Sequence, residues 1–185
     1  MATVTKTIGT SSRNYSTISA WEADLSDGSI YSNGDDAVGE MYADSTFTGA
    51  TVTINGGTDI GGSAGQDLNS VKLTVHSDSR HDGTAESGAL LKPTSGSGHN
   101  VGIIAVARDD LTIEWLDISM DSLDSTNTNT CIRLVSGVGN CTIRNMLIHD
   151  KGGNPGSSGP VGIHGTVAAG TSDNWYFLNN IIYSL

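Results

Sequence analysis

The chain has 185 residues, enough for one domain with a substantial core but short for two. Its 20 acidic residues against 9 lysines and arginines give a net charge of −11, which argues against binding nucleic acid or anionic membrane through bulk charge. The longest apolar run, VGIIAVA at 101–107, is too short to span a bilayer, and the stretch MATVTKTIGTSSRNYS has no secretory apolar core.

The first element that the sequence predicts is an amphipathic helix within YSTISAWEADLSDG, residues 15–28. Ser16 or Thr17 is a suitable N-cap, and Gly28 lies just past the expected end. The apolar side chains that share one face are Ile18, Trp21 and Leu25.

Short β-type runs follow the helix, separated by glycine-rich connectors such as NGGTDIGGSAGQ. These runs are AVGEMYA (37–43), ATVTI (50–54) and VKLTV (71–75).

From residue 99 onward one pattern returns about every thirty residues, as DLTIEWLDISM (110–120), NCTIRNMLIHD (140–150) and NWYFLNNIIYS (174–184). When the copies are aligned on one apolar column, two further apolar columns also align, and a turn-forming Asp or Asn begins each copy, just before the expected strand. The columns are Ile113, Ile143 and Phe177; Leu111, Cys141 and Trp175; and Ile118, Ile148 and Ile182. A partner run precedes each copy, at 101–107, 130–136 and 161–167, with Ile103, Ile132 and Ile163 as its inward column.

A thirty-residue period with β-type spacing is typical of a β-solenoid, whose coils must stack because none can bury its apolar face alone. The alternative is an antiparallel sandwich with coincidental likeness between strands. The earlier run VKLTVHSD fits the same template, which predicts about four coils. We therefore expect one continuous all-β domain, with an N-terminal segment at 1–60 that holds the capping helix and first strands, and the coils at 61–185.

The helix YSTISAWEADL, the strand and turn TVTINGG, and repeats of the CTIRNMLI and NNIIYS kind together resemble the right-handed parallel β-helix superfamily. This superfamily includes pectate-lyase-like enzymes and phage tailspikes, and the likeness covers residues 10–185. The resemblance implies that the helix caps the N-terminal end of the solenoid. It also implies stacked Asn at a bend between two sheets, which Asn145 and Asn179 match and Trp115 does not.

Three polar insertions, at 76–88, 120–130 and 149–160, follow what the alignment treats as the equivalent strand, so we expect them on one side of the column. Loops on a rigid scaffold commonly carry binding sites. The candidate binding residues are His76, Arg80, His81, Asp82, His149 and Asp150. The alternative is that these segments are solvated turns.

Catalysis is not supported by the pattern. Lyases of this fold need clustered carboxylates around Ca²⁺, and hydrolases need paired carboxylates, so either would place acidic residues in one column. Asp117 instead stacks with Leu147 and Ile181. We predict no catalytic residue, no metal site and no cofactor.

Leu147 and Ile181 also stand out because their column points outward if Ile148 and Ile182 point inward. Apolar residues on an outward face predict a subunit contact. A register shift of one residue would place both in the core instead. The last coil ends within NNIIYSL, so we expect either more chain or a partner to cover it.

Three functional hypotheses follow. The first is a phage virion component, such as a tailspike, fibre or capsid-attached protein, assembled in the host cytoplasm without a signal peptide. Its partners would be further copies in a homotrimer, other virion subunits or a host-surface polysaccharide, with no nucleic acid and no membrane insertion. The alternatives are a polysaccharide lyase or hydrolase of the pectate-lyase-like type and a bacterial surface adhesin.

Overall fold

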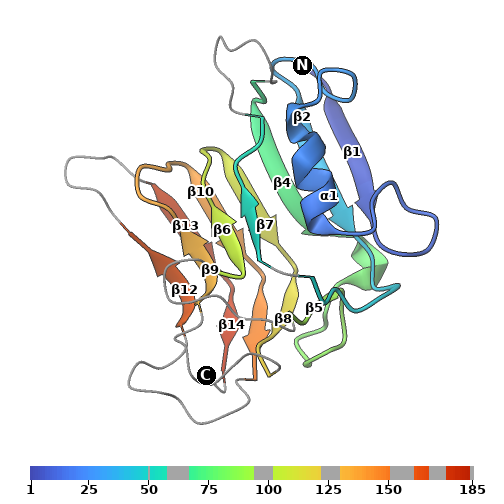
Figure 1. The fold of residues 1–185 in the computed structure, drawn as a ribbon. Coiled ribbons are helices and arrows are strands. Elements are labelled where there is room, and N and C mark those ends of the chain that lie inside the picture. Colours follow the sequence, from blue (N-terminus) through green and yellow to red (C-terminus); the bar gives the residue numbers. More distant parts are fainter. Residues whose placement is uncertain are drawn as a thin grey trace.

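The protein forms a parallel β-solenoid of about four turns, shown by a computed structural model that describes residues 1–49, 51–57, 67–93, 102–121, 130–150, 161–166 and 174–183 (Figure 1). Its strands stack into three parallel sheets, here called sheets A, B and C. Sheet A has six strands: β1 (Thr3–Ile8), β2 (Asp36–Met41), β4 (Ser70–Val75), β7 (Leu111–Glu114), β10 (Cys141–Arg144) and β13 (Trp175–Leu178). Sheet B has four: β5 (Leu90–Leu91), β8 (Asp117–Ser119), β11 (Leu147–His149) and β14 (Ile181–Ile182). Sheet C has four: β3 (Val52–Ile54), β6 (Ile104–Val106), β9 (Thr130–Leu134) and β12 (Val161–Gly165).

The predicted apolar columns are confirmed by the strand register. Ile143 pairs with Ile113 on one side and Phe177 on the other, and Ile148 lies between Ile118 and Ile182. These positions repeat because equivalent side chains of successive coils fill the same place in the core. The column in sheet C was wrong by one residue, since Ile104 rather than Ile103 pairs with Ile132. Both isoleucines are buried, so apolarity alone did not separate them.

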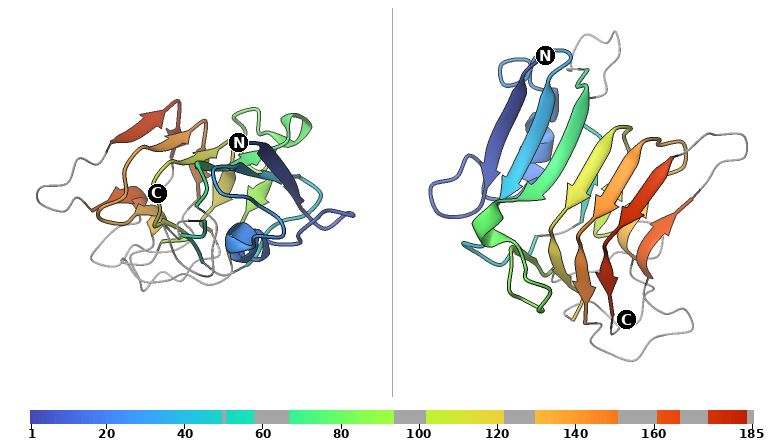
Figure 2. Two further views of the ribbon diagram at one scale, coloured as in Figure 1. Left: turned by 90° about the horizontal axis from the view of Figure 1, so that it is seen from above. Right: turned by 180° about the vertical axis from the view of Figure 1, so that it is seen from behind.

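The capping helix is confirmed and is shorter than predicted. Helix α1 (Ile18–Ala23) continues into the 3-10 helix η1 (Asp24–Ser26), and Thr17 is the N-cap, with its Oγ1 accepting from Ala20 N at 3.1 Å. The buried face carries Ile18, Trp21 and Leu25, as expected. Figure 2 shows α1 at the N-terminal end of the stack, where it contacts β1 and β3. Strand β1 was not predicted, because TVTKTI lies outside the repeats.

The prediction that all three polar insertions leave the coil at the same angular position is wrong. The first, residues 76–88, follows β4 and is joined to β5 by Ala89, so it lies between sheets A and B. The other two follow β8 and β11 at the end of sheet B, and most of each, at 122–129 and 151–160, lies outside the described residues. We call residues 76–89 the strap.

Sheet A is continuous from β1 to β13, so the N-terminal strands and the strands of the later coils belong to one sheet. No helix among the described residues is long and apolar enough to cross a membrane. Both cysteines, Cys131 and Cys141, are buried and free.

Candidate functional site

The corner where the chain passes from sheet A to sheet B is made by Trp115, Asn145 and Asn179 in successive coils. Their φ angles are 67°, 53° and 53°, in the left-handed region that L-residues seldom adopt. Asn tolerates this conformation better than most residues, which explains the two asparagines, whereas Trp115 holds it under strain. The tight bend places these three residues at the same corner of successive coils.

The strap replaces this tight corner in the preceding coil. Its base is closed by Ala89 N donating to Ser79 O at 2.8 Å. Within it, the Asp82 carboxylate accepts from Thr84 N at 2.9 Å and from Ser87 Oγ at 3.0 Å. These bonds, the Thr84 N–H above all, hold the pKa of Asp82 below its ordinary value, so this carboxylate is ionised at neutral pH.

The strap docks on the corner through His81. The His81 side chain is buried, its Nε2 lies 2.8 Å from Asn145 O, and its ring centre lies 5.8 Å from that of Trp115. The Arg80 guanidinium lies 4.8 Å from the centre of the Trp115 ring. A β-carbon at Gly88 would lie 2.5 Å from His81 N, so only glycine permits the return of the strap so close to His81.

Strap and corner together border an open groove of about 340 Å³. Its lining residues are His81, Asp82, Gly83, Trp115, Asn145, Asn179 and Ile181. Within the described part of the chain, the side-chain amides of Asn145 and Asn179 have no protein partner, so both are available to a ligand. The groove therefore combines an aromatic ring with two amides and a carboxylate, which suits a ligand that carries both apolar C–H surface and hydroxyl groups.

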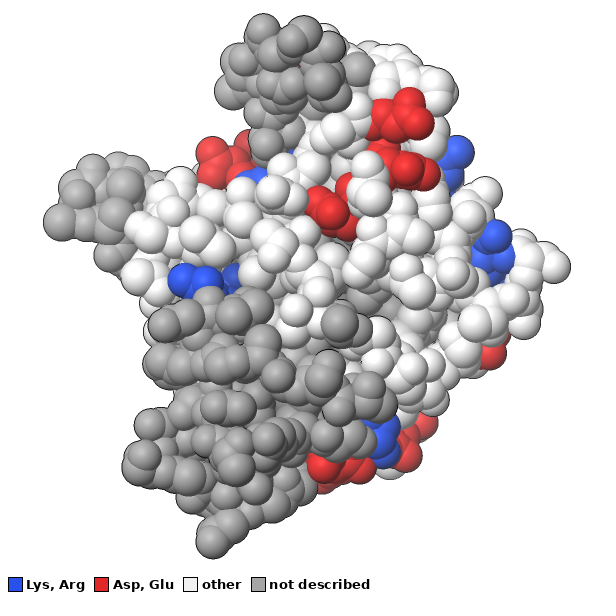
Figure 3. All heavy atoms as spheres, in the orientation of Figure 1, with Lys and Arg blue, Asp and Glu red and all other residues white. Residues whose placement is uncertain are grey.

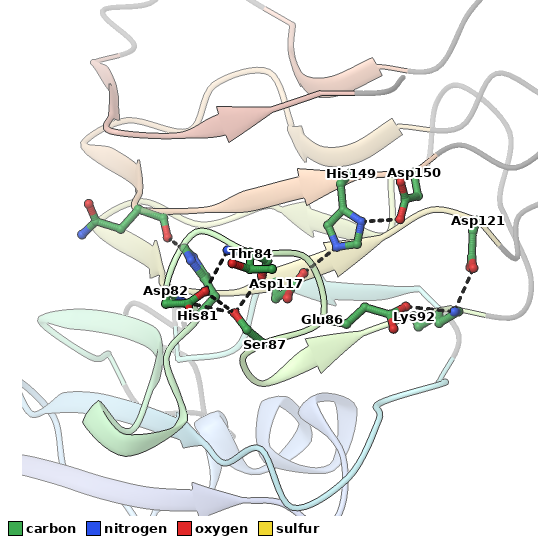
Figure 4. Close-up of polar contacts among 11 residues, drawn as sticks. His81, Asp82, Thr84, Glu86, Ser87, Lys92, Asp117, Asp121, His149 and Asp150 are labelled. Atoms are coloured by element: carbon green, nitrogen blue, oxygen red, sulfur yellow. Dashed lines mark hydrogen bonds and ion pairs between the residues drawn. The ribbon is translucent and has the colours of Figure 1, made fainter.

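Beside the groove, the outer face of sheet B carries a buried charged cluster formed by Asp117, His149 and Asp150. His149 Nε2 lies 2.7 Å from Asp117 Oδ1, and His149 Nδ1 lies 2.7 Å from Asp150 Oδ2. The side chains of Asp117 and His149 are 0% exposed and that of Asp150 is 47% exposed. Figure 4 shows the strap passing beside Asp117, with His149 and Asp150 directed toward one another.

Burial and hydrogen bonding shift the pKa values of His149 and Asp117 in opposite directions. Burial alone lowers the pKa of His149, but the hydrogen bonds to Asp150 and Asp117 outweigh it and raise that pKa above its ordinary value. Burial raises the pKa of Asp117, and the hydrogen bond from His149 opposes this only in part.

The cluster does not have the form of an open catalytic site. Both nitrogens of His149 are engaged by carboxylates, and neither Asp117 nor His149 reaches solvent. Three nearby buried atoms, Asp117 Oδ2, Ser119 Oγ and His81 Nδ1, have no partner among the described residues. Over the same part of the chain, no group of His, Cys, Asp and Glu side chains could hold a metal ion.

The six candidate binding residues fall at three places. Arg80, His81 and Asp82 lie at the groove, and His149 and Asp150 lie in the buried cluster. His76 lies apart, stacked on Tyr42 with ring centres 4.6 Å apart. Of the two predicted contact residues, Leu147 is fully buried and Ile181 is 46% exposed, so Ile181 alone offers surface to a partner.

Sequence reasoning missed Asp117 because its own column holds only Leu147 and Ile181. The pairing register of strands β8 and β11 shows that Asp117 lies close to His149. Ser119 pairs with His149, so Asp117 stands two residues from the partner of His149 and on the same face of the sheet. Side chains on such a diagonal lie within reach of one another.

No family model, no curated protein and no solved structure matches this chain.

On the face shown in Figure 3, lysines and arginines are scattered among acidic side chains, and the part described there has no continuous basic patch.

Proposed function

We propose that this protein is a structural β-solenoid of a phage virion, of the tailspike, fibre or capsid-attached kind, and that it binds a host-surface glycan in the groove between strap and corner. The protein would then belong to the pectate-lyase-like β-helix superfamily, which its repeats resemble. Support for this affiliation comes from the parallel solenoid with its N-terminal capping helix.

The observation that carries the glycan proposal is the composition of the groove. A sugar ring presents an apolar C–H face, which packs on an aromatic ring, and an edge of hydroxyls, which need both donors and acceptors. Trp115 supplies the ring, and Asn145 and Asn179 supply amides that donate and accept. Asp82 adds a charged acceptor, and hydrogen bonds to charged groups are stronger than neutral ones.

Assembly is the second part of the proposal. Ile181 lines the groove and is half-exposed on the outer face of sheet B, and Tyr183 beside it is 38% exposed. We propose that copies pack side by side as a trimer along this face, which would place the groove close to a subunit boundary. Apolar side chains gathered on an outer face support such a contact.

The test is binding of the purified full chain to an array of bacterial capsular and O-antigen polysaccharides. We expect retention of one structural class by the wild type and its weakening in Trp115→Ala by a factor of about ten, since a stacking aromatic ring contributes up to about 1.5 kcal/mol. The matched control is Tyr176→Ala, which removes a 50% exposed aromatic ring on sheet A, away from the groove.

Binding that survives Trp115→Ala, or that Tyr176→Ala weakens equally, would contradict the groove as the site. Release of shorter oligosaccharides from the bound polysaccharide would favour the lyase or hydrolase alternative instead. Because Trp115 has a strained backbone, circular dichroism and thermal unfolding of each variant must match the wild type before the binding result is interpreted.

A further inference from the structure

The three sheets do not begin at the same level at the capped end of the solenoid. Strand β1 extends sheet A beyond β2, whereas sheet C begins at β3 and sheet B is extended only by the bridge between Phe47 and Leu91. Helix α1 contacts β1 and β3 at this end. Its first residue, Ile18, is preceded by Ser16 and Thr17, so small hydroxylated residues lie beside the first coil in place of large apolar ones.

A cavity of about 290 Å³ lies at this place, between the start of α1 and the first coil, and we call it the cap cavity. Five apolar side chains, each between 2% and 6% exposed, form its inner wall: Ile18, Phe47, Val52, Leu91 and Ile103. Hydrogen bonds to the next coil hold this wall, since Phe47 N donates to Leu90 O at 2.8 Å and Val52 N donates to Ile103 O at 2.9 Å. The wall is therefore part of the folded core and is present without a ligand.

The mouth of the cap cavity carries hydroxyl groups from two segments of the chain. They belong to Thr10, Ser16, Thr17, Ser19, Ser45, Thr46 and Thr48. Within the described residues, the side chains of Ser16, Ser19, Ser45 and Thr46 make no hydrogen bond to the protein. Each of these hydroxyls can both donate to a ligand and accept from it.

The cap cavity is uncharged along the whole of its described lining. The adjacent Asp44 is already engaged, because its carboxylate accepts from Thr10 N at 2.9 Å and from Ser11 N at 3.3 Å and pairs with Arg13 at 2.9 Å. An ionised ligand would find no opposite charge in the cavity, and removal of an unpaired charge from water is costly. The lining therefore favours a neutral ligand.

We propose that the cap cavity binds a small neutral amphiphile, an aliphatic alcohol of about eight to ten carbons, with its chain against the apolar wall and its hydroxyl at the mouth. An apolar cavity of about 150 Å³ takes a benzene ring, so the cap cavity has room for roughly twice as many non-hydrogen atoms. All the wall side chains except Phe47 are aliphatic, and a flexible chain can fit between such groups. The ligand would fill the space between α1 and the first coil and so stabilise the folded protein by mass action.

This proposal does not rest on the glycan proposal. The cap cavity shares no lining residue with the groove between strap and corner. Either site can therefore be refuted while the other stands.

The test is an NMR titration of the full methyl-labelled chain with 1-octanol, kept below its solubility limit. We expect saturable shifts of the methyl groups of Ile18, Val52, Leu91 and Ile103, while those of Ile148, fully buried in β11, stay unchanged. Octanoate has the same chain length and an ionised head, and we expect it to bind more weakly by about tenfold or more. Absence of saturable shifts, equal shifts at Ile148 or equal affinity for octanoate would overturn the proposal.

Three variants locate the ligand. Val52→Phe places a larger ring in the cavity, so we expect its affinity for 1-octanol to fall by about tenfold or more. The matched control is Thr53→Phe, which adds the same ring at the next position of β3, on the exposed face, and leaves the affinity unchanged. Leu91→Phe fills the cavity from β5 and replaces Val52→Phe if that variant does not fold. Undiminished binding in the filled variant, or an equal loss in Thr53→Phe, would refute the cap cavity as the site.

Discussion

At the scale of single residues, the fold packs closely where a glycine lets a large side chain approach the backbone. Trp21 is fully buried and lies over Gly39 of β2, where a β-carbon would come within 2.6 Å of the indole ring. Trp21 Nε1 also donates to the Tyr31 hydroxyl at 3.2 Å, which fixes the ring in place. The capping helix therefore depends on the absence of a side chain at this position.

We predict that Gly39→Ala lowers the free energy of unfolding by about 1 to 3 kcal/mol, because the added methyl overpacks a core that cannot yield. Urea unfolding followed by circular dichroism measures this change. The matched control is Gly49→Ala, where a β-carbon meets nothing within 4 Å. Equal stabilities for the two variants would mean that Trp21 moves freely and does not anchor the cap.

At the scale of elements, the corner between sheets A and B sets the path of each coil. Asn145 has a φ of 53°, and its side chain makes no hydrogen bond within the part of the chain that the structure describes. Asn145 therefore contributes to the fold through its backbone conformation and not through a side-chain hydrogen bond. Replacement by alanine introduces left-handed strain without loss of a side-chain contact, whereas replacement by glycine introduces none.

We therefore expect Asn145→Ala to be less stable than Asn145→Gly by about 1 to 2 kcal/mol, the cost of a left-handed conformation at a residue with a β-carbon. Thermal unfolding of the two proteins under one buffer condition gives the comparison. If alanine were as stable as glycine, the corner would not be strained and the asparagines would need another explanation.

At the scale of the whole molecule, the solenoid could be predicted from sequence because stacking imposes the same residue type at the same place in each coil. Ile113, Ile143 and Phe177 show this most clearly. The position of the strap could not be predicted, because β4 and β5 are separated by an insertion where later coils have a two-residue corner. The burial of Asp117 and His149 escaped prediction for a related reason: the outer face of a sheet is buried only when a distant segment covers it.

The assembly proposal is also tested at this scale. We expect light scattering of the purified chain to give three times the 19.1 kDa of one copy. Ile181→Glu should reduce that mass to one copy, because a charge would then be buried in the contact. A monomeric wild type would remove the side-by-side trimer from the account and leave the groove as a property of the single chain.

The most direct measurement of the central claim is an NMR titration of the labelled chain with a bacterial O-polysaccharide retained on the array. The account predicts shifts of the Trp115 indole and of the Asn145 and Asn179 side-chain amides, while the indoles of Trp21 and Trp175 stay unchanged. Trp21 is fully buried, and Trp175 Nε1 donates to Val138 O at 2.8 Å in the last coil, so both report on binding elsewhere. Shifts at Trp175 with none at Trp115 would place the ligand outside the groove and contradict the account.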